Sequence, residues 1–137
     1  MSEDMIELGR RAVACKGWRW LPGMLALDSS GVEHPARVTD HRRSAIYEDS
    51  DGAMHEGVVS YSDVPDLTDP ATLGCLLALV RAAWEPHRSD DPVCCTHQSL
   101  DGKWGVGSWV SRVFAAVCLP AFDTEAEALV AALEAAP

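Results

Sequence analysis

Three residues that lie close together in the second half of the chain are of types that can bind zinc. Cys94, Cys95 and His97 offer two thiolates and an imidazole, and His87 precedes them. Structural zinc sites usually separate their paired cysteines by intervening residues, whereas Cys94 and Cys95 are adjacent. On a strand, Cys95 and His97 point to one face and Cys94 to the other. We therefore expect buried cysteines beside a surface histidine, with no metal and no other cofactor.

A cysteine nucleophile is the second chemistry that these residue types allow. A reactive thiolate needs a neighbouring base and an oxyanion site. The chain has five cysteines and five histidines, but no spacing pairs one with another. The odd number of cysteines and their irregular spacing also argue against a disulfide framework. An enzyme with a dispersed Cys/His site is therefore our last hypothesis, and we expect no catalytic residue.

Trp18, Arg19 and Trp20 form the most distinctive short stretch of the chain. An arginine between two aromatic residues suits stacking on a base, a cation–π contact or an interface hot spot. Alternatively, the two tryptophans belong to the core and flank a surface arginine. The residue types leave both interpretations open, so these three residues are a candidate binding site for a ligand or partner.

Acidic residues are concentrated in the middle of the chain. The formal net charge is −10, and no lysine or arginine lies between Arg43 and Arg81. A general nucleic-acid binder needs the opposite balance, so we expect no direct binding of nucleic acid. These acids either solvate loops or form a partner-binding face. The candidate residues for that face are Glu48, Asp49, Asp51, Glu56, Asp63 and Asp66.

Hydrophobic patterning and turn residues predict an order of helix, strands, helix, strands, helix. This order indicates an α+β fold, with an antiparallel sheet and helices packed on one side of it. The length of 137 residues favours a single domain over residues 1–137. The expected helices begin at Ser2, Asp69 and Asp123 or Thr124, and the expected strands are Met24–Leu27, Ala36–Val38, Ser44–Tyr47, Gly57–Tyr61, Val93–Gln98, Lys103–Trp109 and Ser111–Leu119.

The clearest element is the helix predicted from Asp69 to Trp84. An aspartate followed by proline is a strong helix opening. Between Ala71 and Trp84, Arg81 is the only charged residue. A helix that is apolar on nearly all sides is buried or covered by a second subunit, so a homodimer through this helix is one expectation. Gly74 weakens the helix, which indicates close contact with a neighbouring element there.

No apolar run approaches the ~20 residues needed to cross a bilayer. The first residues, Met1 to Asp4, are acidic, whereas a signal peptide begins with basic residues. We therefore expect no membrane association and a cytoplasmic location.

Three strings of the chain resemble a family of small proteins encoded in bacteriophage and prophage genomes. They are Trp18–Leu25, Pro65–Arg81 and Thr124–Pro137, at the start, middle and end of the chain. The resemblance implies a setting, the cytoplasm of a bacterial host, but no established activity and no catalytic residue. It also implies that the protein acts by binding, because small acidic phage proteins often block a host protein.

The leading hypothesis is therefore a non-enzymatic phage accessory protein. Its expected partner is a host or phage protein, such as a defence protein or one that binds nucleic acid, whose basic groove takes the acidic segment. The alternative is an oligomeric protein that binds a nucleotide signal between subunits. In that case the helix from Asp69 to Trp84 joins the subunits, and Trp18, Arg19 and Trp20 hold the base.

Overall fold

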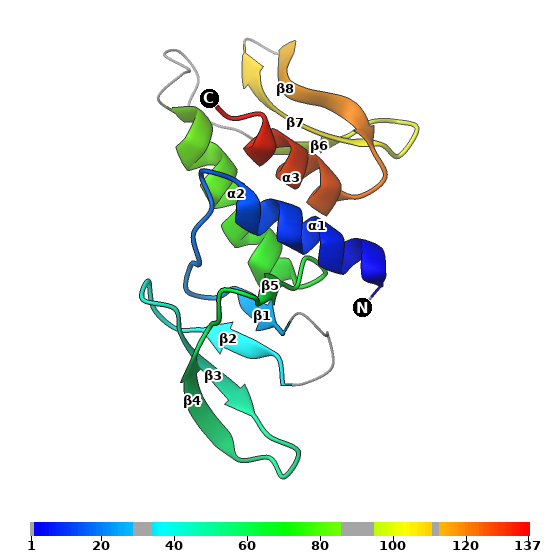
Figure 1. Ribbon diagram of the computed structural model, residues 1–137. Coiled ribbons are helices and arrows are strands. Elements are labelled where there is room, and N and C mark those ends of the chain that lie inside the picture. Colours follow the sequence, from blue (N-terminus) through cyan, green and yellow to red (C-terminus); the bar gives the residue numbers. More distant parts are fainter. Residues whose placement is uncertain (1, 29–33, 86–94, 111–112) are drawn as a thin grey trace. The chain divides into compact units, whose positions relative to one another are not determined.

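The computed structural model describes residues 2–28, 34–85, 95–110 and 113–137 (Figure 1). The chain has a mixed α+β fold with antiparallel sheets, and its elements follow the expected order of helix, strands, helix, strands, helix. Its contacts divide it into two compact units, one formed by Met1–Ala14 with Arg19–Cys75 and the other by Cys15–Trp18 with Leu76–Pro137. The single domain expected over residues 1–137 remains a prediction.

The first unit is built on a five-stranded antiparallel sheet. The strand order is β4-β3-β2-β1-β5, so β4 and β5 are the two edges. Helix α1 packs against β5, and a Cβ atom on Gly9 would lie only 3.1 Å from the Cβ of Val64. The glycine therefore allows the helix to approach the strand closely. The elements are α1 (Glu3–Ala14), β1 (Leu25–Leu27), β2 (Ala36–Val38), β3 (Ser44–Glu48), β4 (Met54–Val58) and β5 (Val64–Pro65).

Strand β4 begins three residues earlier than the sequence pattern predicted, at Met54 instead of Gly57. Asp49 is the reason, because its side chain closes the turn between β3 and β4. The Asp49 carboxylate accepts hydrogen bonds from the backbone N–H groups of Asp51 and Ala53, both at 2.9 Å. Gly52 adopts the left-handed φ of 81° that this turn requires. The chain therefore reverses within a few residues, and Met54 already pairs with Glu48.

Helix α2 (Pro70–Trp84) begins as the Asp69-Pro70 pair predicted. The Asp69 carboxylate accepts from the backbone N–H of Thr72 at 2.9 Å and from its hydroxyl at 2.8 Å. The same carboxylate receives two hydrogen bonds from Arg37 of β2, at 2.7 and 3.1 Å. The Thr72 hydroxyl in turn accepts from the backbone N–H of Leu25 at 2.9 Å. The start of α2 is therefore attached to β1 and β2 by a connected polar network.

Of the two expectations for α2, burial on all sides does not hold for its small residues, and cover by a second subunit remains a prediction. Leu76, Leu79 and Val80 are buried, but the small side of the helix is exposed. Alanine and glycine expose little apolar area, so their exposure costs little free energy. Within the part of the chain that the structure describes, a Cβ on Gly74 would meet no atom within 4 Å, so the close neighbour expected there is not found. The exposed residues are Ala71, Gly74, Ala78, Arg81 and Ala82.

The second unit contains a three-stranded antiparallel sheet in the order β6-β7-β8, against which α3 packs. Thr124 and Glu127 form the predicted capping box at the start of α3, each side chain bonding to the other residue's backbone N–H. The indole of Trp84 donates to the carbonyl of Ala132 at 2.8 Å, which attaches the end of α2 to α3. None of the helices in the described ranges is long and apolar enough to cross a bilayer. The elements are β6 (Cys95–Gln98), β7 (Trp104–Val110), β8 (Val113–Phe122) and α3 (Glu125–Glu134).

Candidate functional site

The β3–β4 hairpin, residues 44–58, extends beyond the rest of its sheet (Figure 1). Strand β4 is an edge, and β2 pairs with β3 only at Ala45 and Ile46. The part of the hairpin from Tyr47 to His55 therefore continues past β2. The hairpin carries four acidic residues (Glu48, Asp49, Asp51, Glu56) and no lysine or arginine.

One face of the hairpin combines exposed apolar side chains with glutamates. The strand register places Ile46 opposite Glu56, Met54 opposite Glu48, and Val58 opposite Ser44. Directly paired residues lie on the same side of an antiparallel sheet. Ile46, Met54 and Val58 are exposed to 36%, 61% and 67% of their surface. We call this surface, formed by Ile46, Met54, Val58, Glu48 and Glu56, the apolar–acidic face.

An open hollow of about 550 Å³ lies along this face. Ile46, Glu56 and Val58 contribute to its lining, together with Ser44. The face is therefore concave, with apolar side chains and a carboxylate within one hollow. Exposed apolar surface of this kind is typical of sites that contact another macromolecule.

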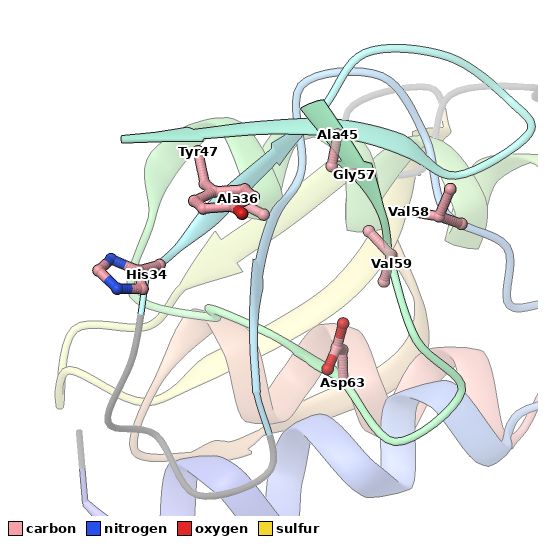
Figure 2. Close-up of a pocket in the computed structure, with 8 residues that line it drawn as sticks. All are labelled: His34, Ala36, Ala45, Tyr47, Gly57, Val58, Val59 and Asp63. Atoms are coloured by element: carbon pink, nitrogen blue, oxygen red, sulfur yellow. The ribbon is translucent and has the colours of Figure 1, made fainter. Parts of the chain in front are cut away.

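The opposite face of the hairpin carries Ala45, Tyr47, His55 and Gly57. Three small residues on this side, Ala36, Ala45 and Gly57, leave room for a cavity of about 230 Å³ (Figure 2). Tyr47 forms one side of it, since a Cβ on Gly57 would lie 3.6 Å from the Cε1 of Tyr47. His34 and Asp63 lie at other points of the lining.

The ring of Tyr47 is positioned by two histidines. It stacks on His55 with ring centroids 5.3 Å apart, and the ring of His34 lies 5.9 Å away. Nε2 of His55 donates to Oδ2 of Asp49 at 2.6 Å. This hydrogen bond, assisted by the backbone N–H of Ala53, holds the pKa of Asp49 below its usual range. The carboxylate is therefore ionised where it fixes His55.

The predicted acidic residues do not form one surface. Glu48, Asp51 and Glu56 are exposed on the hairpin. Asp63 accepts from the backbone N–H of Ser60 at 2.7 Å and lines the cavity beside Tyr47. Asp66 follows β5, at the sheet edge opposite β4, where its carboxylate accepts from the backbone and hydroxyl of Thr68.

The residues that give the hairpin its character were missed in the sequence: Ile46, Tyr47, Met54 and Val58. The available signal was the turn sequence Asp49–Gly52 directly after the predicted strand Ser44–Tyr47, because a short turn there starts the second strand soon after Gly52. A hairpin centred on Asp49–Gly52 would have paired Ile46 with Glu56 and Tyr47 with His55. Placing the second strand at Gly57–Tyr61 hid that pairing.

Trp18, Arg19 and Trp20 differ in exposure. Trp20 is buried in the core of the first unit, Arg19 is exposed, and Trp18 is partly buried in the second unit. The burial of Trp20 agrees with the interpretation of tryptophans in the core beside a surface arginine. Arg19 is the member of the stretch whose side chain is open to solvent.

The candidate thiol and imidazole residues are partly described. Cys95 and His97 lie on β6, opposite Gly107 and Gly105, and Cys94 lies outside the described residues. Among the residues that the structure places, no three His, Cys, Asp or Glu side chains gather as metal ligands would. Burial raises the pKa of the Cys75 thiol, which donates to the carbonyl of Pro22 at 3.5 Å. This thiol is therefore protonated and a poor nucleophile.

Comparison with known proteins identifies no relative of this chain. No protein-family model matches the chain, and no curated protein or solved structure is significantly similar to it.

Proposed function

We propose that this chain is a non-enzymatic binding protein that docks on another protein through its β3–β4 hairpin. The observation that carries the proposal is the exposure of Ile46, Met54 and Val58 on one face, beside Glu48 and Glu56. Single exposed apolar residues are common, but a contiguous group with a polar rim marks an interaction surface. The partner surface that fits it is apolar and surrounded by lysine or arginine.

Charge supports a basic partner. The chain has a net charge of −10, and the hairpin itself contains four acidic residues and no lysine or arginine. Opposite charge on the partner would speed association and reject acidic proteins, while the apolar contacts would supply most of the affinity. Binding of this kind weakens as salt screens the charges.

The edge position of β4 supports the same conclusion. An edge strand presents unpaired backbone N–H and C=O groups, which natural proteins commonly protect with lysine or proline. Strand β4, Met54–Val58, contains neither. An extended segment of the partner could therefore pair with β4 while its side chains contact the apolar–acidic face.

The biological setting follows from the resemblance to phage and prophage proteins. In that setting, the partner is a protein of the bacterial host with a basic groove, such as a defence protein or one that binds nucleic acid. The hairpin would occupy that groove and block it. The acidic composition and the absence of an evident catalytic motif in the sequence support this role.

The test uses affinity capture from bacterial lysate with paired variants. The triple variant Ile46→Ser, Met54→Ser and Val58→Ser removes the apolar side chains from the face. Leu100→Ser is the matched control, because Leu100 is fully exposed in the turn between β6 and β7. Circular dichroism and thermal unfolding establish that each variant is folded.

We expect the wild type and Leu100→Ser to capture the same basic protein in equal amounts. The triple variant should not capture it. Raising the salt concentration should release it. Equal capture by all three proteins, or loss with Leu100→Ser alone, would overturn the proposal.

A further inference from the structure

The cavity beside Tyr47 is too small for most cofactors and large enough for one long side chain. Its volume is about 230 Å³, whereas pockets for drug-sized molecules and cofactors span about 300 to 1,000 Å³. It lies on the face of the hairpin opposite Ile46 and Met54, and Val58 also contributes to its lining. A partner that binds around the hairpin tip would therefore contact both the apolar–acidic face and the face with the cavity.

The lining of the cavity combines small apolar residues with one described carboxylate, that of Asp63. Ala36, Ala45 and Gly57 present methyl groups and backbone, and Val59 adds an apolar wall. Figure 2 shows the carboxylate of Asp63 pointing toward this space from the loop before β5. Oδ2 of Asp63 accepts from the backbone N–H of Ser60. Oδ1 accepts no hydrogen bond from the described residues, so it can accept one from a ligand.

The aromatic rings in the lining add a second kind of recognition. Tyr47 and His34 border the same cavity, and Tyr47 is held against His55. The flat face of a tyrosine attracts a cation, most strongly a planar guanidinium that can stack on it. No lysine or arginine is among the lining residues that the structure describes. The nearby Arg43 is engaged elsewhere, with its guanidinium 4.2 Å above the ring of Tyr61.

We infer that this cavity binds a guanidinium group on an aliphatic stem. The stem lies along Ala36, Ala45 and Gly57, while the guanidinium stacks on Tyr47 and pairs with Asp63. Lysine fits less well, because its ammonium can pair with Asp63 but cannot stack on the ring. The guanidinium can come from an arginine side chain of the partner, which rests on the proposed function. It can also come from a free guanidino compound.

The test is an NMR titration of the full chain with small probes, without any partner protein. Nα-acetylarginine amide is compared with Nα-acetylcitrulline amide, which has the same shape and no charge. The arginine probe should bind with a dissociation constant on the order of millimolar, as expected for one side chain. The citrulline probe should bind at least about fivefold more weakly. The backbone amide signals of Gly57, Val59 and Asp63 should move.

Two variants locate the site, and a third serves as the control. Asp63→Asn keeps an acceptor for Ser60 but removes the charge, and Tyr47→Leu removes the ring; each should weaken the arginine probe at least about threefold. Asp51→Asn removes a more exposed charge, from the hairpin turn, and should leave binding unchanged. Equal binding of the two probes, or equal loss with Asp51→Asn, would overturn the inference.

The source of the guanidinium is decided with two further probes. A blocked Gly-Arg-Gly peptide that binds at least as tightly as agmatine supports an arginine of the partner. Agmatine binding with no peptide binding would overturn that source and leave a free guanidino compound. If arginine binds while the triple apolar variant still captures its protein, the cavity stands and the proposed function fails. If no probe binds while capture depends on the apolar face, the function stands and the cavity inference fails.

Discussion

At the tip of the β3–β4 hairpin, Nε2 of His55 lies 2.6 Å from Oδ2 of Asp49. The same carboxylate accepts the backbone N–H groups of Asp51 and Ala53 and so closes the turn. His55 in turn stacks on Tyr47, which borders the cavity. One aspartate therefore connects the shape of the turn to the position of the ring on which we place a guanidinium.

The first prediction concerns Asp49. Asp49→Ala removes the side-chain acceptor of the turn, so the hairpin tip should loosen and the melting temperature should fall. Asp49→Asn keeps one oxygen for the backbone but removes the charge beside His55, so it should retain most of the stability. Thermal unfolding and the NMR signals of the Tyr47 ring measure the two effects. Equal behaviour of the two variants would mean that the backbone contacts of Asp49 contribute little.

The second prediction concerns the pH dependence of the Arg37–Asp69 pair. The hydrogen bonds from Arg37, with those from Thr72, hold the pKa of Asp69 below its usual range. A carboxylate whose pKa is lower in the folded than in the unfolded chain stabilises the fold above the usual carboxyl range. That contribution is lost as the pH falls below about 4 toward the lowered pKa.

Two substitutions of Asp69 test this pH dependence. Asp69→Asn should be less stable than the wild type at pH 7, and the difference should shrink in acid. Asp69→Ala also removes the helix cap and should cost about 1 to 3 kcal/mol at pH 7. Urea unfolding at a series of pH values measures both. Asp51→Asn is the control, since Asp51 is exposed, and its stability curve should follow the wild type.

The third prediction compares two glycines in helices. A Cβ on Gly74 would meet no atom within 4 Å in the described part of the chain, so Gly74→Ala should stabilise α2 by about 1 kcal/mol. A Cβ on Gly9 would lie 3.1 Å from the Cβ of Val64, so Gly9→Ala should destabilise α1 against β5. Chemical unfolding decides between them. If Gly74→Ala destabilises instead, something beyond the described residues, such as a second copy of the chain, covers that side of α2.

The fourth prediction concerns the glutamates of the apolar–acidic face. Glu48→Gln with Glu56→Gln should slow association with a basic partner and reduce its salt dependence, with a smaller effect on dissociation. Stopped-flow or surface-based kinetics at several salt concentrations measure this. Glu3→Gln with Glu85→Gln is the control for the same change in net charge, because both residues are exposed and lie outside the hairpin. An equal effect of the control would assign the effect to net charge alone.

Much of the fold was predictable because its signals are local. The Asp69-Pro70 opening of α2 and the Thr124–Glu127 capping box each depend on residues within one helical turn, and both are confirmed. The α+β class and the order of elements follow from periodicity within single segments in the same way. Composition alone, likewise, sets the acidity of the hairpin.

Relations between distant segments required the tertiary structure. The register of β3 on β4 decides that Ile46, Met54 and Val58 share a face, and a different pairing would have turned them apart. The cavity joins residues of the hairpin to His34, Ala36 and Asp63 from other segments. The exposure of Ala71 and Gly74 on α2 depends on which side of the helix its neighbours occupy. The type of each side chain is known from the sequence alone. A binding surface also depends on which strands pair and which segments pack together, and the free energy of that packing depends on residues far apart in the chain.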